Sequence, residues 1–303
     1  MEFGKLSDIS QVDFNLPKDA DRNQRVLTKS DTHSQPKIYI GMARWGDRNL
    51  VGKLYPKGTP SKDYLYHYSR QFNTIEMNTT HYRIPTLDMV EQWKEKTPAD
   101  FKFCPKVPQV ISHSSDFGKS IRATDQFLEA LHAFGDQLGL AFMQLPPTFE
   151  PRNNGKALFD YLSHWPHDVP LSIELRHPGW FEDDRIRERA FDLLEENYLS
   201  TVITDTAGRR DVIHMQLTNP KLMVRFVGNS LHPTDYERID QWVSRIENWI
   251  ELGLQELYFI VHQPEDALCI DLAIYLVDHL NKQLKLNLKP PKLMQAGIQK
   301  TLF

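Results

Sequence analysis

Acidic, basic and imidazole side chains stand at or near the ends of short apolar stretches along much of the chain. Glu76, Lys106, Glu174, Asp205 and His262 have this placement. Carboxylate, amine and imidazole groups that face one small volume shift one another's pKa values and can exchange protons with a bound molecule. We therefore predict that these five residues are catalytic, with one of the glutamates as general base and His262 as general acid.

A second group of residues has the character of a binding surface. Arg176 and Arg225, together with Lys106, supply positive charge that suits an anionic substrate, phosphorylated or nucleotide-like. Tyr82 and Trp180 offer rings that can stack on a base or another ring. The predicted substrate-binding residues are Asn78, Tyr82, His113, Gln144, Arg176, His177, Trp180 and Arg225, of which His177 is also an alternative general acid.

These residues also have a purely structural interpretation. A Glu174–Arg176 or Glu76–Arg225 ion pair can serve only to hold the fold together. Trp180 is more typical of a core residue than of a binding residue. Convergence of several charged side chains on one volume is what favours a site over a set of separate structural contacts.

No motif of a known metal or nucleophile class occurs in the sequence. HxH, HExxH and Cys/His spacings are absent, and so is the GxSxG turn of serine hydrolases. We predict no cofactor. The alternative is a divalent metal, Zn²⁺, Mn²⁺ or Mg²⁺, held by Glu, Asp and His side chains from different strands.

Short β-branched and aromatic stretches alternate with longer amphipathic ones from Lys37 onward. Strands are expected at 37–43, 74–78, 101–106, 139–145, 171–175, 200–205, 222–228 and 256–262. Helical patterns occupy 124–138, 184–197, 236–253 and 265–284, and only a short helix fits between the sixth and seventh strands. Such alternation over about 250 residues is typical of a (β/α)8 barrel of the TIM type, an α/β fold.

A doubly wound open sheet is the alternative fold. The turn after its first strand usually carries a glycine-rich phosphate pattern, which "GMARWGDRN" does not match. In a barrel, active sites form at the C-terminal ends of the strands. Alternation of side chains along each strand puts Glu76, Glu174, Arg225 and His262 on the inner face. We expect Lys106, Gln144 and Asp205, at or near the ends of their strands, to face the same volume.

The barrel is expected as a single domain at 37–286, between an irregular N-terminal arm at 1–36 and an extended C-terminal tail at 287–303. With 40% hydrophobic and 25% charged residues and no apolar run long enough for a bilayer, the composition is typical of a soluble protein. The N-terminus lacks the features of a signal peptide, so we expect a cytoplasmic protein with Cys104 and Cys269 as buried free thiols. The net charge of −4 argues against a protein that coats nucleic acid.

The stretch "FNTIEMNTTHYRIPTLDMVEQWKEKTPADFKFCPKVPQVISH" resembles the signature of the DUF72 family, also called the YecE-like proteins. The family's spaced residues fall on Glu76, Asn78, Tyr82, Trp93, Thr97, Pro98, Phe101, Phe103, Lys106 and His113. Further matches are Gln144 with Pro146 and Pro147, then Glu174, Arg176, His177, Trp180, Asp205, Arg225, Gly228 and His262.

This resemblance covers about 37–280 and implies a TIM-like barrel, but it implies no reaction. Many members have G-T-S-G/S-W after the first strand, where this chain has "GMARW". The last strand also departs from the common pattern, since "VHQPEDA" follows it. Both departures fall in loops over the predicted pocket, so a substrate does not carry over from other members.

The chain ends in "QKTLF", which resembles the Q-x-x-L-F peptide by which bacterial DNA polymerases and mismatch-repair proteins bind the sliding clamp. Gln299 would occupy a polar subsite, and Leu302 and Phe303 an apolar one. Pro290 and Pro291, after the last helix, prevent its continuation and favour an extended linker. A non-catalytic or DNA-repair accessory protein is therefore the second functional hypothesis. The alternative is that Leu302 and Phe303 pack against the barrel.

Overall fold

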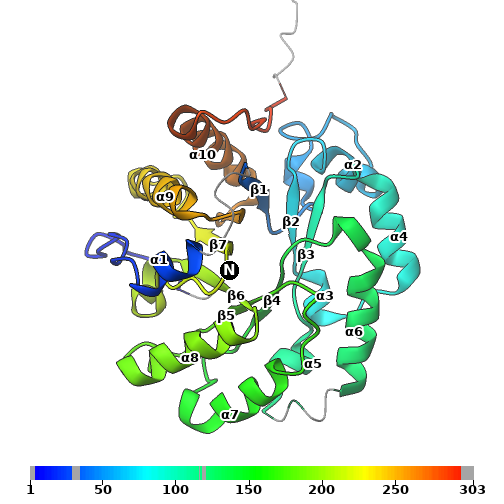
Figure 1. Cartoon of the computed structure of the whole chain (residues 1–303). Helices are drawn as coiled ribbons and strands as arrows, with labels where there is room; N and C mark the ends of the chain where they lie inside the picture. Colours follow the sequence, from blue (N-terminus) through cyan, green and yellow to red (C-terminus); the bar gives the residue numbers. More distant parts are fainter. Residues whose placement is uncertain (1–3, 29–34, 116, 118–120, 295–303) are drawn as a thin grey trace, which may run out of the picture.

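The chain folds around a ring of parallel strands, which Figure 1 shows with the helices outside it. The computed structural model describes residues 4–28, 35–115, 117 and 121–294. Within these ranges the strands are β1 (Lys37–Met42), β2 (Thr74–Met77), β3 (Lys102–Pro105), β4 (Ala141–Gln144), β5 (Leu171–Glu174), β6 (Ser200–Asp205), β7 (Lys221–Val227) and β8 (Glu256–His262). The predicted strands and the (β/α)8 TIM-like barrel are confirmed.

The strands follow one another around the ring in chain order. The sheet order is β3-β2-β1-β8-β7-β6-β5-β4, and β1 pairs with both β2 and β8. Between β3 and β4 there are only isolated bridges, Phe103 with Leu138 and Lys106 with Phe142. The barrel is therefore nearly closed, and its looser seam lies beside Lys106.

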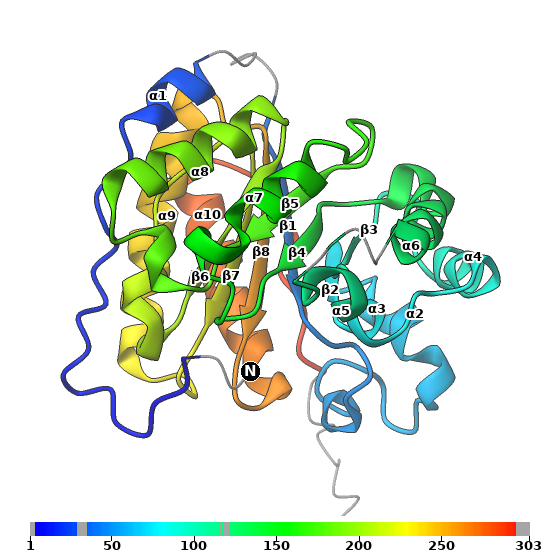
Figure 2. The same ribbon diagram turned by 90° about the horizontal axis from the view of Figure 1, so that it is seen from below.

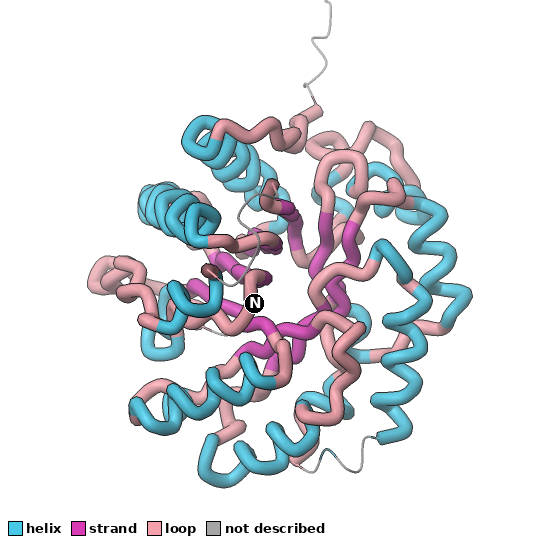
Figure 3. Tube along the Cα trace, viewed as in Figure 1, coloured by secondary structure: helices cyan, strands magenta, loops and turns pink. Residues whose placement is uncertain are grey.

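Helices surround the strands on the outside, as Figure 3 shows in cyan around magenta. They are α2 (Tyr64–Tyr68), α3 (Thr79–Tyr82), α4 (Leu87–Lys96), α5 (Gln109–Ser112), α6 (Ile121–Ala133), α7 (Pro151–Leu162), α8 (Asp184–Glu196), α9 (Pro233–Leu252) and α10 (Cys269–Leu284). Asp183 begins α8 by accepting from the Arg185 and Ile186 amides. The predicted start of α6 at Thr124 is wrong, because the helix already contains Ile121. None of the helices in the described ranges is both long and apolar enough to cross a membrane.

Apolar side chains fill the barrel interior away from the C-terminal ends of the strands. They are Cys104, Leu140, Phe142, Val202, Met223, Tyr258 and Ile260. The rings of Tyr39 and Tyr258 stack with centroids 4.7 Å apart. Larger clusters of buried apolar residues lie between the strands and the helices. The polar side chains at the C-terminal ends of the strands therefore lie over a packed apolar interior.

The N-terminal arm contains a short helix, α1 (Arg22–Leu27), which lies beside α8 and α9 in Figures 1 and 2. Between β6 and β7 the chain forms only a short 3₁₀ segment, Ala207–Val212. The helix α1 therefore occupies the position on the outside of the barrel that the helix of this unit usually takes. Arg22 pairs with Glu188 and Asp192 of α8 at 2.7 and 2.9 Å. The prediction of an irregular arm is wrong for this segment, because six residues are too few to show helical periodicity.

The tail after α10 packs along the body of the protein. Leu286 and Leu288 contact the main apolar core. The Lys292 amide donates to the Gln71 side chain at 2.9 Å, and the Met294 amide donates to the Lys53 carbonyl at 2.7 Å. The predicted extended tail is therefore docked as far as Met294. The three residues predicted to contact a partner lie outside the described residues: Gln299, Leu302 and Phe303.

Replacing Gly41 with alanine should strongly destabilise the barrel. Gly41 lies in β1 beside Thr74 of β2, and a methyl group there would stand 2.2 Å from the Thr74 carbonyl oxygen. We expect a loss of at least about 3 kcal/mol in the free energy of unfolding, or no soluble protein. Urea unfolding measures it. Gly46→Ala is the matched control, because no atom lies within 4 Å of the added methyl group. Equal stability of the two variants would contradict the close strand contact.

Candidate functional site at the C-terminal end of the barrel

A buried arginine joins carboxylates from two distant strands at the centre of the barrel mouth. Arg225 of β7 donates to both oxygens of Glu76 on β2, from Nε at 2.8 Å and from Nη2 at 2.7 Å. Its Nη1 donates to Glu174 of β5 at 2.9 Å. The guanidinium also lies 5.3 Å from the centroid of Phe142. Glu76, Glu174 and Arg225 lie on the inner face of their strands, as their alternation along each strand predicts. They meet because the strands close into a ring.

Further polar side chains extend this network around the mouth. Glu174 also accepts from the Arg176 Nε and from the Thr204 hydroxyl, both at 2.7 Å. Glu76 accepts from the Asn78 amide at 2.8 Å, and its Oε2 lies 3.2 Å from the His262 Nε2. Thr204 was not among the predicted site residues, although its place one position before the end of β6 gives it the inward direction.

The site has a deep tier and a shallow tier. Glu76, Glu174 and Arg225 are between 0 and 1% exposed. Above them lies a ring of side chains that are 6 to 9% exposed: Lys106, Gln144, Arg176 and His262. Any molecule that approaches from solvent therefore meets the shallow ring first, and the deep tier supports that ring from below.

Both buried glutamates are ionised at neutral pH. Burial alone would raise the pKa of Glu76, but the charge of Arg225 and the hydrogen bonds from Arg225 and His262 outweigh it and hold that pKa well below its usual range. Burial likewise opposes Arg176 and Arg225 at Glu174, whose pKa falls to about 2. A carboxylate with so low a pKa is a poor general base near pH 7. The predicted role of a glutamate as general base is thus disfavoured, and positioning of the cations suits both residues better.

His262 is a neutral imidazole with a defined proton. Burial lowers its pKa, and this effect exceeds the opposing attraction of Glu76. An ionised carboxylate can only accept, so the His262 Nε2 carries the hydrogen that Glu76 receives. Its Nδ1 is then left with a lone pair. This arrangement favours a general base at His262 over the predicted general acid.

Lys106 differs from the two arginines because no carboxylate pairs with it among the described residues. Its Nζ donates to the Gln144 Oε1 at 3.0 Å. Burial lowers the pKa of Lys106 to about 8, and the positive charge of Arg225 contributes further. A buried ammonium without a counter-ion is costly, so this amine loses its proton more readily than an ordinary lysine does.

Two histidines lie near the end of β3, and one of them was not among the predicted site residues. His81 is buried, and its Nδ1 donates to the Val107 carbonyl at 3.0 Å. Burial, followed by the charge of Lys106, lowers the pKa of His81 to about 4. The predicted His113 is exposed, and its ring centroid lies 5.1 Å from that of His81. His81 stands directly before Tyr82 in the DUF72-like signature, and that position was the available signal.

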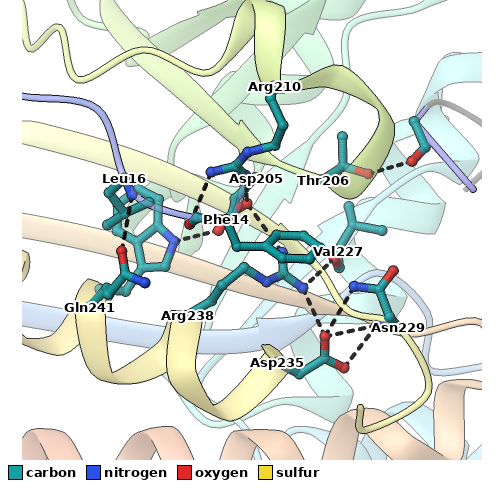
Figure 4. A network of polar contacts seen from close by, with 12 residues as sticks. Phe14, Leu16, Asp205, Thr206, Arg210, Val227, Asn229, Asp235, Arg238 and Gln241 are labelled. Atoms are coloured by element: carbon teal, nitrogen blue, oxygen red, sulfur yellow. Dashed lines mark hydrogen bonds and ion pairs between the residues drawn. The ribbon is translucent and has the colours of Figure 1, made fainter. Parts of the chain in front are cut away.

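Asp205 does not face the barrel mouth, so the expectation that it shares one volume with Lys106 and Gln144 is wrong. As Figure 4 shows, it lies between Arg210 and Arg238, and it accepts from both. Its other oxygen accepts from the Trp242 indole at 2.8 Å. Asp205 ends β6 on the face toward α9, because the inward position belongs to Thr204 one residue earlier. The ring of Phe14 from the arm covers Arg238, with a centroid distance of 4.8 Å.

Three predicted binding residues lie outside the buried network at the barrel mouth. Trp180 is 2% exposed, and its indole donates to the Phe149 carbonyl at 2.8 Å, so it is a core residue. The His177 Nδ1 accepts from the Gly179 amide at 3.0 Å within a tight turn. Tyr82 is 75% exposed at the end of α3, beside the ring of His81. Tyr82 is therefore the better placed of the two predicted stacking rings.

Cavities in the structure include one at the opposite end of the barrel. It has a volume of about 420 Å³ and is lined by Lys37, Tyr39 and Tyr258, among others. The polar side chains at the C-terminal end instead pack against one another, and an open pocket above them stays a prediction. Across the described residues, no three His, Cys, Asp or Glu side chains are grouped as metal ligands. Cys104 is a buried free thiol, and burial raises its pKa to about 12.

The network and its flanking histidines fall within a segment that matches a family model described as "Protein of unknown function DUF72", over residues 39–295. The chain belongs to the DUF72 family. The resemblance seen in the signature is thereby confirmed, and the family description itself states no activity.

Relatives and solved structures agree with this assignment. The UPF0759 protein YecE of Escherichia coli is 29% identical over 265 residues, 82% of this chain and 94% of YecE. The UPF0759 protein YunF of Bacillus subtilis is 26% identical over 202 residues, 64% of this chain and 71% of YunF. A crystal structure of a DUF72 family protein from Enterococcus faecalis superposes with a TM-score of 0.66 at 20% identity, over 84% of this chain and all (100%) of that one. A DUF72 family protein from Thermotoga maritima gives a TM-score of 0.63 at 18% identity, over 82% and 100%. These two structures support the fold.

The stability of the protein should rise with pH in a way that depends on Lys106. Its pKa is about 8 in the folded chain against 10.5 for an ordinary lysine, so between these values the unfolded chain holds a proton that the folded chain has lost. Relative to Lys106→Met, the wild type should gain roughly 1.4 kcal/mol for each pH unit across this window. Below pH 8 the variant should be the more stable protein.

Urea unfolding of both proteins between pH 7 and 10 measures this difference. Lys156→Met is the control, because the Lys156 side chain is 88% exposed. Its stability should follow that of the wild type at every pH. Parallel curves for the wild type and Lys106→Met would contradict a lysine that is buried without a counter-ion.

Proposed function

We propose that this chain is an enzyme that binds a small anionic substrate at the C-terminal end of the barrel and acts on it by acid–base chemistry. The observation that carries the proposal is an excess of positive charge in the shallow tier. Glu76 and Glu174 are engaged by Arg225 and Arg176, whereas Lys106 has no carboxylate partner among the described residues. An anionic group, phosphate or a nucleotide's phosphate among them, would supply the missing negative charge.

The residues divide into supporting and reacting groups. Arg225 is held on two sides by carboxylates, so we assign it to the scaffold and assign anion binding to Lys106 and Arg176. His262, oriented by Glu76, is the general base. Tyr82 and His113 are both exposed, and we assign them to an aromatic or sugar part of the substrate.

Anion binding should depend on Lys106. Isothermal titration calorimetry with inorganic phosphate, pyrophosphate and a nucleoside monophosphate should detect binding of at least one of them to the full chain. Lys106→Met should weaken that binding tenfold or more, about 1.4 kcal/mol, because it removes the unpaired cation. Lys156→Met should bind as the wild type does. Failure of all three anions to bind, or equal affinity in Lys106→Met, would remove the basis of the proposal.

We also propose a second candidate function, recruitment to a bacterial sliding clamp through the C-terminal peptide. The supporting observation is that the tail is hydrogen-bonded to the body at Met294, five positions before Gln299. A peptide that begins beyond a fixed anchor can occupy a partner's groove without unfolding the barrel. In this role the protein would be a non-catalytic or DNA-repair accessory factor.

The clamp hypothesis predicts binding by the full chain and by a peptide of residues 291–303. Fluorescence polarisation should give a dissociation constant of tens of micromolar or tighter with a purified bacterial clamp, a range typical of short motifs. Replacing both Leu302 and Phe303 with alanine should abolish binding, whereas replacing Lys300 with alanine should change it little. Absence of binding at these concentrations would end this candidate and leave the barrel site unaffected.

A further inference from the structure

We propose that Lys106 is a covalent catalytic residue whose neutral amine attacks the carbonyl carbon of an anionic aldehyde or ketone and forms an imine. This inference rests on the proposed function, since Arg176 would hold the anionic group of the same substrate. It narrows the substrate class from anions in general to anions that carry a reactive carbonyl.

The backbone at Lys106 is fixed from both sides of the loose seam. Its amide donates to the Met77 carbonyl at 3.3 Å, and its carbonyl accepts from the Thr80 hydroxyl at 2.7 Å. A bridge to Phe142 joins it to the next strand of the ring. Lys106 therefore extends its side chain from a rigid strand end, which is the placement of catalytic residues in barrels of this type.

The amine is oriented without being neutralised by a carboxylate. The Gln144 Oε1, 3.0 Å away, accepts one N–H and leaves the nitrogen lone pair unengaged when the amine is neutral. Arg225 and Arg176 instead have carboxylate partners at 2.7 to 2.9 Å. If Lys106 had only a structural role, we would expect its ammonium group to form an ion pair with one of those carboxylates. Lys106 has the surroundings of a nucleophilic lysine, desolvated and beside other cations.

Burial and the neighbouring cations lower the pKa of Lys106 to about 8. At pH 7 roughly a tenth of the molecules then carry the neutral amine, compared with fewer than one in a thousand for an ordinary lysine. His81 gives its Nδ1 hydrogen to the Val107 carbonyl, so its Nε2 keeps a lone pair that can accept a proton. Burial lowers the pKa of His81 and of His113, and the positive charge of Lys106 lowers both further.

The chemical step is balanced without any further reactant. The Lys106 nitrogen forms a bond to the carbonyl carbon, and the carbonyl oxygen takes up a proton while the nitrogen loses one. The resulting carbinolamine loses its hydroxyl group as water and leaves a carbon–nitrogen double bond. Amine and carbonyl compound give imine and water, with no oxidation or reduction. The imine then makes the neighbouring carbon more acidic, which suits the acid–base chemistry assigned to His262.

Trapping with borohydride tests the proposal. The full chain is incubated at pH 7.5 with pyridoxal 5′-phosphate, an aldehyde that carries a phosphate, and in parallel with glyoxylate, a much smaller anionic aldehyde. Sodium borohydride reduces any imine to a stable amine, and peptide mass spectrometry measures the modified fraction at each lysine. The aldehyde concentration that modifies half of Lys106 should be at least tenfold lower than the concentration that modifies half of Lys156, whose side chain is 88% exposed. Any anion found to bind by calorimetry should protect Lys106.

Lys106→Arg separates this proposal from the proposed function. Arginine keeps the positive charge but forms no such imine, so the variant should still bind anions in calorimetry and should lose the adduct at position 106. If anions bind but Lys106 reacts with neither aldehyde faster than Lys156, the covalent role is overturned and the anion site stands. If neither binding nor modification occurs, both proposals fail.

Discussion

The C-terminal end of this barrel depends on one buried cation, Arg225, held between two buried carboxylates. Its ion pairs join β7 to β2 and to β5 across the ring. Removing Arg225 would leave the buried Glu76 carboxylate with only the Asn78 amide and the neutral His262 ring as partners, in a region that water does not reach, at a cost of several kcal/mol. The three side chains therefore hold one another in place. The shallower groups that hydrogen-bond to the two glutamates are positioned by this contact.

The same constraint decides which groups are free for chemistry. Glu76 and Glu174 satisfy Arg225 and Arg176, so their negative charge is used within the protein. Lys106 donates to an amide oxygen, and the His262 Nδ1 keeps a lone pair because the ring hydrogen is on Nε2 and is donated to Glu76. The reactivity proposed for this site follows from an uneven distribution of counter-ions, since burial is similar for Lys106 and Arg176.

Outside the mouth, a second buried carboxylate organises the flank of the barrel. Asp205 accepts from Arg238 and Trp242 of α9 and from Arg210 of the 3₁₀ segment. Phe14 of the arm lies over these guanidinium groups, and α1 further along the arm covers the position beside α8 and α9. The arm therefore completes the helix layer where the unit between β6 and β7 is short.

The sequence by itself determined the eight strands, their order and the inward direction of Glu76, Glu174, Arg225 and His262, because strand periodicity is a local property. It also indicated that Lys106 and Gln144 end strands at the same mouth. Only the tertiary structure decided the pairing: which carboxylate meets which cation, that Asp205 turns outward to α9, that Trp180 is enclosed, and that His81 and Thr204 join the site. These outcomes depend on contacts between residues far apart in the chain, and a buried charge selects its partner through burial and distance, which no local pattern records.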